Sequence, residues 1–160
     1  MSDDQSLRIR LAAFQWLAAQ TEVHGEALPR ALLERGFEFE GFRVPLVGPQ
    51  GIFKPRLLVD APLSMTTVTG GPYQDTFAGD LISYAYRGTD RQHRDNVGLR
   101  RAMAEHLPLI YFFGERSGWY RPVWPVFVVG DRPSELHFDI AVDDANFVTP
   151  GLDQEVAEDR

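Results

Sequence analysis

The fold is decided by residues 107–129, which read LPLIYFF, GERSG and WYRPVWPVFVV. The first segment is a continuous apolar run rich in strand-forming side chains, which indicates a buried strand. The polar GERSG segment predicts a turn, and the residues after it predict a second strand. Pro122 and Pro125 interrupt this second strand. Because proline has no N–H to donate to a ladder, we expect an edge strand or a bulge there.

Helices and further strands are predicted around this pair. Apolar residues recur at helical spacing over residues 5–21, and a shorter helix is predicted over 28–35. A third helix is expected from a cap at Asp95 or Asn96 to about residue 106. Further strands are predicted at 37–44 (a hairpin that turns at 40–41), 57–59, 63–68, 81–87 and 136–142. Because helices and strands do not alternate as βαβ units, the pattern predicts an α+β fold with a curved, largely antiparallel sheet flanked by about three helices.

Length and composition limit the class of protein. The 160 residues suit one domain, which we place at 1–150, followed by an acidic linker or tail at 151–160. The chain has no cysteine, which excludes disulfides, thiolate zinc sites and cysteine nucleophiles. No apolar run suits a signal peptide or a membrane span, so we expect a cytoplasmic protein.

The segment most informative about function is 86–101, which reads YRGTDRQHRDNVGLRR. It holds five arginines in a chain of net charge −7. Arginine is planar and permanently charged, and its fork of donors suits phosphates and base edges. A cationic island on an acidic body predicts one local anionic ligand. The cations expected to form a phosphate-contacting rim are Lys54, Arg56, Arg87, Arg91, Arg94 and Arg100.

Motifs for catalysis are missing. A nuclease of the Asp/Glu-x-Lys kind needs a carboxylate two residues before Lys54, where Ile52 stands, and no P-loop motif is present. The four histidines are scattered, so we expect no metal and no cofactor. His93 and Asn96 either reach bases and phosphates or cap and brace their loop. Two alternatives to a binding module stay open. One is a nuclease or nucleotide-processing domain that uses His93, Asp95 and Asn96, and the other is a protein-interaction domain.

Several strings of the sequence together resemble a known family. They are residues 48–56, 62–65, 72–73, 86–90, 93–96 and 98–100. From about Phe14 to Asp143, the chain resembles the sulfur-binding domain that precedes the nuclease domain in bacterial type IV HNH restriction endonucleases, which read phosphorothioate-modified DNA. No HNH unit is present in this sequence. The resemblance therefore implies a non-catalytic reader of DNA without its nuclease.

This resemblance also implies a partner and a mode of recognition. The partner is double-stranded DNA that carries a backbone phosphorothioate, and a C-terminal HNH nuclease domain is expected in the full-length protein. Sulfur is more weakly hydrated than oxygen, so an apolar pocket loses little by desolvating it. The candidate walls of this pocket are Pro62, Pro72 and Tyr73. The expected DNA contacts are His24, Lys54, Arg56, Arg87, Arg91, His93, Arg94, Asn96 and Arg100.

Overall fold

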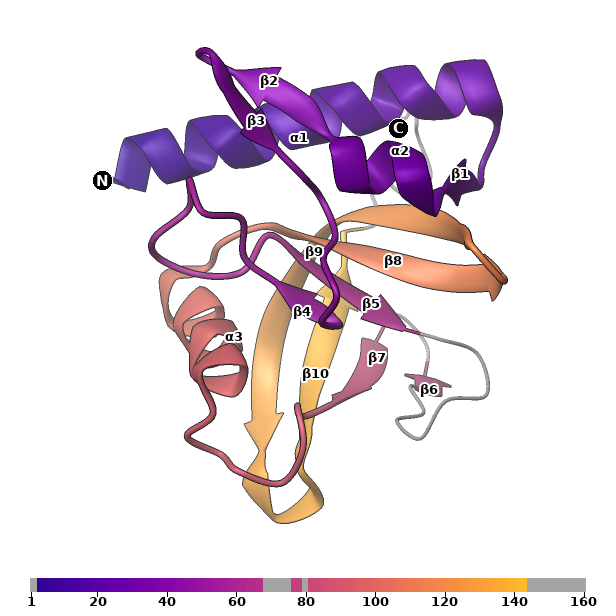
Figure 1. The fold of residues 1–160 in the computed structure, drawn as a ribbon. Helices are drawn as coiled ribbons and strands as arrows, with labels where there is room; N and C mark the ends of the chain where they lie inside the picture. Colours follow the sequence, from indigo (N-terminus) through magenta and orange to yellow (C-terminus); the bar gives the residue numbers. More distant parts are fainter. Residues whose placement is uncertain (1–2, 68–75, 79–80, 144–160) are drawn as a thin grey trace, which may run out of the picture.

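A computed structural model describes residues 3–67, 76–78 and 81–143 of the chain (Figure 1). In this part three α-helices flank one curled, mostly antiparallel sheet, and a separate two-stranded hairpin packs beside the first helix. The predicted α+β fold, with a curved sheet and about three helices, is confirmed. The helices are α1 (Asp3–His24), α2 (Arg30–Arg35) and α3 (Arg94–Glu105). The expected tail at 151–160 lies outside the described residues.

The large sheet has the order β4–β5–β8–β9–β10–β7–β6, and β1 pairs with β9 beside it. The β5–β8 pair is parallel, whereas the other pairs are antiparallel. The strands are β1 (Leu28–Pro29), β2 (Phe37–Phe39), β3 (Phe42–Val44), β4 (Ile52–Phe53), β5 (Ser64–Thr67), β6 (Thr76–Ala78), β7 (Leu81–Ala85), β8 (Leu109–Arg116), β9 (Trp119–Arg132) and β10 (His137–Val142), and a short 3-10 helix (Pro133–Glu135) joins the last two.

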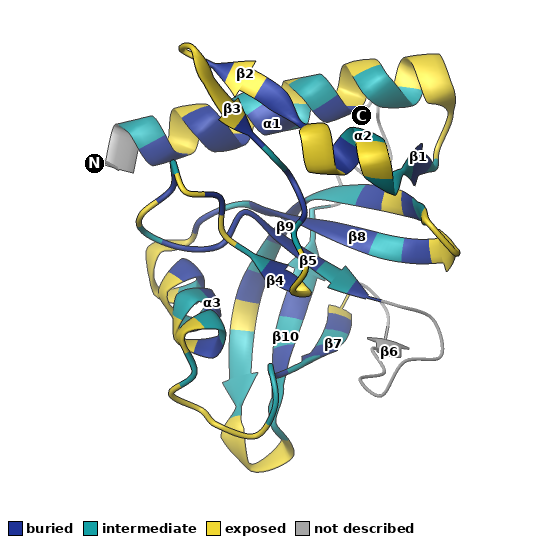
Figure 2. Ribbon diagram, in the orientation of Figure 1, coloured by how far each residue is buried: buried dark blue, intermediate teal, exposed yellow. Residues whose placement is uncertain are grey.

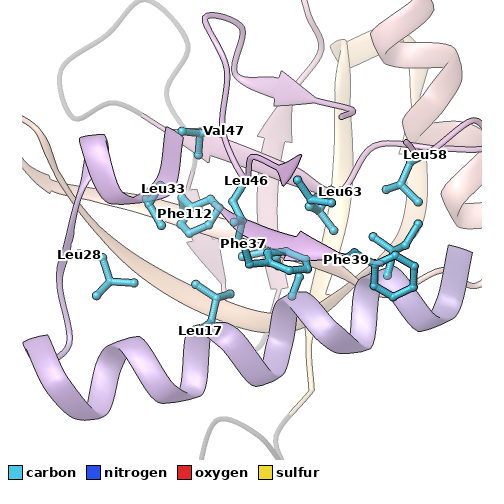
Figure 3. Packing of buried hydrophobic residues seen from close by; sticks show 14 of the residues in the cluster. Leu17, Leu28, Leu33, Phe37, Phe39, Leu46, Val47, Leu58, Leu63 and Phe112 are labelled. Atoms are coloured by element: carbon cyan, nitrogen blue, oxygen red, sulfur yellow. The ribbon is translucent and has the colours of Figure 1, made fainter. Parts of the chain in front are cut away.

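Strand β8 is buried on both faces, as its continuous apolar run predicts. Ile110 and Phe112 point into a hydrophobic cluster with α1, α2 and the β2–β3 hairpin (Figure 3). Leu109 and Tyr111 belong to a second cluster, which includes Leu99 of α3. Successive side chains of a strand point to opposite faces, so one strand supplies both cores. Figure 2 shows β8 and β5 as mostly buried.

Strand β9 is not an edge strand along its length, which corrects part of the prediction. It pairs with β8 on one side, and with β1 and then β10 on the other. The β1 pairs end at Tyr120 and the β10 pairs begin at Val126, so among the described residues β9 has no strand partner on that side between them. Both prolines lie in this interval. The predicted bulge is also present, because the β8–β9 register shifts beside the cis Trp124–Pro125 bond.

Other element boundaries also differ from the prediction. The second helix begins at Arg30, because Leu28 and Pro29 pair with β9 as β1. The hairpin of β2 and β3 turns at Glu40–Gly41 as expected. Residues 57–59 do not form the predicted strand, since the Leu58 N–H donates to the Pro55 carbonyl at 3.0 Å and closes a turn there.

The inner face of α1 carries a buried charge. Arg10 has no exposed surface, and its guanidinium donates to the carbonyl oxygens of Pro62 at 2.7 Å and Pro108 at 3.2 Å. It also donates to the Ala61 carbonyl at 3.0 Å and the Asp60 carboxylate at 3.2 Å. A buried guanidinium is tolerated when its donors are satisfied. The Arg10 network therefore fixes the β4–β5 loop and the residue before β8 against α1.

Candidate functional site

The segment 86–94, which we term the arginine loop, is held closed by Asn96. The Asn96 side chain is fully buried, and its Oδ1 accepts from the Arg87 N–H at 2.8 Å. Its Nδ2 donates to the carbonyl oxygens of Arg87 at 3.0 Å and Asp90 at 2.8 Å. Of the two roles that the sequence left open for Asn96, the structure gives it the bracing one. Asn96 is therefore a positioning residue in this structure and is not exposed to a ligand.

His93 caps α3, which corrects the prediction that Asp95 or Asn96 does so. The Asp95 N–H donates to His93 Nδ1 at 3.1 Å. The two predicted caps are used elsewhere, because Asp95 pairs with Arg87 and Asn96 turns inward. Because Nδ1 accepts a hydrogen bond, the proton of the neutral imidazole lies on Nε2. Nε2 is thus the ring nitrogen that has a hydrogen to donate.

Two arginines of the loop region are tied to carboxylates. Arg87 Nη1 lies 3.0 Å from Asp95 Oδ2. Arg100 Nε lies 2.9 Å from Asp131 Oδ2, and the other oxygen of Asp131 accepts from the Tyr86 hydroxyl. Arg100 Nη2 also donates to the Arg91 carbonyl at 3.3 Å.

These contacts join the arginine loop to the start of α3 and to the end of β9. Asp131 was missed by sequence reasoning. It lies outside the arginine segment, and nothing in its own sequence neighbourhood marks it as the partner of Arg100.

Two other arginines of this region extend into solvent. The Arg94 side chain is 88% exposed, and its one ion-pair contact, to its neighbour Asp95, is 3.9 Å long. Arg91 is exposed and takes part in none of the ion pairs found among the described residues. Figure 2 shows the connection that leads into α3 as largely exposed. The structure therefore presents two exposed guanidinium groups, and the charge of one of them, Arg91, also acts on Asp131.

The other predicted cations lie away from this loop. Lys54 and Arg56 are exposed on the β4–β5 loop, where Lys54 Nζ donates to the Leu58 carbonyl at 3.0 Å. This loop runs between α1 and α3 (Figure 1). His24 ends α1 next to β1, which pairs with the start of β9, whereas the arginine loop is bonded to Asp131 near the end of β9. The structure thus groups Arg87, Arg91, His93, Arg94 and Arg100, and places His24 at the opposite end of β9.

The predicted sulfur pocket is only partly within the described residues. Pro62 is buried, its carbonyl accepts from Arg10, and its ring packs against Gly98 of α3. An added Cβ at Gly98 would lie 2.9 Å from Pro62 Cδ, so no ligand group fits between them. Pro62 is therefore a buried packing residue in this structure and offers a ligand little surface. Pro72 and Tyr73 lie outside the described residues.

The residues proposed for a nuclease site are engaged within the loop. His93 caps α3, Asp95 pairs with Arg87, and Asn96 braces the backbone. In the described part of the chain, no three His, Asp or Glu side chains are grouped so that they could hold a metal ion. Among the same residues, no helix has the length and apolar character needed to cross a membrane.

Comparison of the chain with protein-family models, with curated protein sequences and with solved structures gives no match.

The Asp131 carboxylate makes the free energy of unfolding depend on pH in the acid range. Burial alone would raise its pKa, but hydrogen bonds from Tyr86 and Arg100 and the charges of Arg100 and Arg91 outweigh burial and lower the pKa below 3.8. The Asp131 pKa is therefore lower in the folded state than in the unfolded state. The ionised carboxylate stabilises the fold at pH values above its unfolded-state pKa, and this contribution is lost as the pH falls through the folded-state pKa.

We therefore expect Asp131→Asn to lower the free energy of unfolding by about 1–3 kcal/mol at neutral pH, because hydrogen bonds to a charged group are lost. The difference from the unaltered chain should narrow as the pH falls below about 5. Urea unfolding across this range measures both quantities. A difference that stays constant with pH would show that the Asp131 charge contributes nothing.

Proposed function

We propose that this chain is a non-catalytic DNA-binding module that recognises phosphorothioate-modified DNA and targets an attached HNH nuclease. The observation that carries the proposal is the pair of exposed guanidinium groups, Arg91 and Arg94, on a loop that the buried Asn96 holds closed. A loop already fixed in one conformation loses little entropy when it binds a ligand. Arginine on such a loop suits phosphate groups, which it contacts with two parallel donors.

The charge distribution supports a local anionic ligand. The chain has a net charge of −7, so DNA is repelled by most of the molecule and attracted at the arginine loop. Phosphate contacts of this kind position a protein on DNA without reading the bases. Recognition of a modified backbone needs only such contacts and one additional group that distinguishes sulfur from oxygen.

The sulfur preference is proposed from the family resemblance of the loop strings. A phosphorothioate keeps the negative charge of the backbone, so arginine side chains still hold it. Its sulfur is weakly hydrated and accepts hydrogen bonds poorly, so apolar walls favour it over oxygen. Pro72 and Tyr73 are the remaining candidates for these walls, and Lys54 and Arg56 are candidates for contacts to neighbouring phosphates.

Matched duplexes test this function. One duplex carries a single phosphorothioate, the other is identical with oxygen, and the two sulfur diastereomers are measured separately. We expect one sulfur-bearing diastereomer to bind at least tenfold more tightly than the oxygen duplex, a difference of about 1.4 kcal/mol. Equal affinities would remove the sulfur reading, and the absence of any DNA binding would remove the module's proposed function and favour a protein-interaction domain.

A further inference from the structure

We propose that the four arginines of the site divide into two kinds, in an inference that rests on the proposed DNA-binding function. Arg91 and Arg94 contact the DNA backbone. Arg87 and Arg100 are positioning residues, which hold the two contacting arginines in place through carboxylates and the loop backbone. The sequence places all four in one cationic segment and does not separate them. The two kinds are distinguished by the carboxylates and backbone groups that each arginine contacts in the structure.

The first step of the argument concerns charge. Arg87 has Asp95 at 3.0 Å and Arg100 has Asp131 at 2.9 Å, and both carboxylates are only 15% and 12% exposed. A cation that already faces a fixed anion carries little net charge toward a second anion. A phosphate that approaches either arginine also approaches this fixed carboxylate, whose negative charge repels it. The paired arginines are therefore the poorer candidates for contacts.

The second step concerns what the paired arginines hold. Arg100 donates through Nη2 to the Arg91 carbonyl, so it fixes the backbone from which the Arg91 side chain extends. Arg87 bonds Asp95, the neighbour of Arg94 in the first turn of α3. Each positioning arginine thus lies beside one contacting arginine. In both cases an ion pair orients the backbone of the loop, and the guanidinium of the neighbouring contacting arginine stays exposed.

The salt dependence of binding separates the two kinds. A cation that neutralises a DNA phosphate releases condensed counterions, and the logarithm of the binding constant then falls with the logarithm of salt concentration by about 0.9 per contact. A positioning residue changes affinity through the geometry of the loop and releases no counterion of its own. Its loss therefore weakens binding at every salt concentration by the same factor.

The experiment measures binding of a short duplex with one phosphorothioate over a series of salt concentrations. We expect Arg91→Ala and Arg94→Ala each to weaken binding roughly 5- to 150-fold, and to make the salt slope less steep by about 0.9. The paired variants Arg87→Gln/Asp95→Asn and Arg100→Gln/Asp131→Asn keep the net charge. They should weaken binding and leave the slope unchanged. Arg43→Ala removes an exposed cation on β3 that pairs with Glu38, and serves as the control with neither effect.

The outcomes distinguish this division from the proposed function itself. A paired variant that flattens the slope as much as Arg91→Ala would overturn the division, while DNA binding would stand. Arg91→Ala or Arg94→Ala with an unchanged slope would do the same. If the unaltered chain bound no duplex, or bound with an affinity that salt does not change, both the division of the arginines and the proposed function would be overturned. Thermal unfolding of each variant confirms that the compared proteins are folded.

Discussion

Replacing Arg10 by methionine is expected to lower the free energy of unfolding by about 3–5 kcal/mol, because it leaves buried polar groups without a partner. The Asp60 side chain is only 6% exposed and would lose its counter-ion. The carbonyl oxygens of Ala61, Pro62 and Pro108 would also lose a donor. Methionine preserves most of the side-chain length, so the decrease in stability reports the lost polar contacts more than lost packing. Chemical denaturation at neutral pH measures the free energy of unfolding.

Arg8→Met is the matched control for this prediction. Arg8 lies two residues earlier on α1, its side chain is 52% exposed, and its ion pair with Glu40 lies at the surface. Exposed ion pairs contribute about 0–1 kcal/mol, so we expect little change. Adding Asp60→Ala to Arg10→Met should restore part of the lost stability, because the unpaired charge is removed. Equal effects of Arg8→Met and Arg10→Met would contradict the structural role of the Arg10 network.

Asn96→Leu is expected to cost about 2–4 kcal/mol of stability, since it removes the hydrogen bonds that close the arginine loop. The N–H and carbonyl of Arg87 and the carbonyl of Asp90 would be left without these partners. Under the proposed function, DNA binding should weaken as well, because the loop that carries Arg91 and Arg94 would no longer be held in one conformation.

The control is Gln92→Ala, which alters an exposed side chain of the same loop and should change stability by about 0.5 kcal/mol or less. Amide hydrogen exchange supplies a second readout. The Arg87 amide should exchange faster in Asn96→Leu than in the unaltered chain, because its acceptor is gone. An Asn96→Leu protein with unchanged stability and exchange would remove the bracing role.

The features that the sequence predicts are those carried by neighbouring residues. The buried strand β8 follows from its continuous apolar run, and the β2–β3 turn follows from Glu40–Gly41. The cationic character of the arginine loop likewise needs no knowledge of distant segments. Local patterns of this kind are what single-sequence reasoning detects.

The features that the sequence does not predict depend on partners far along the chain. Arg8 and Arg10 look equivalent in sequence, and only the approach of Asp60 shows that one of them is buried. Asp131 comes to Arg100 because β9 brings it alongside α3. For the same reason, the separation of the site's arginines into exposed and paired kinds follows from the fold and not from the sequence pattern.

The parallel pairing of β5 with β8 has a consequence for how the molecule assembles. Ser64 lies beside Ile110, so these partners are 46 positions apart, and the arginine loop is part of the connection between them. Closing so long a connection carries a large entropy cost, and this cost arises before the contacts between the two strands can offset it. A growing polypeptide cannot form this pair until β8 has been synthesised. We therefore expect the arginine loop to be among the last parts of the protein to become ordered during folding.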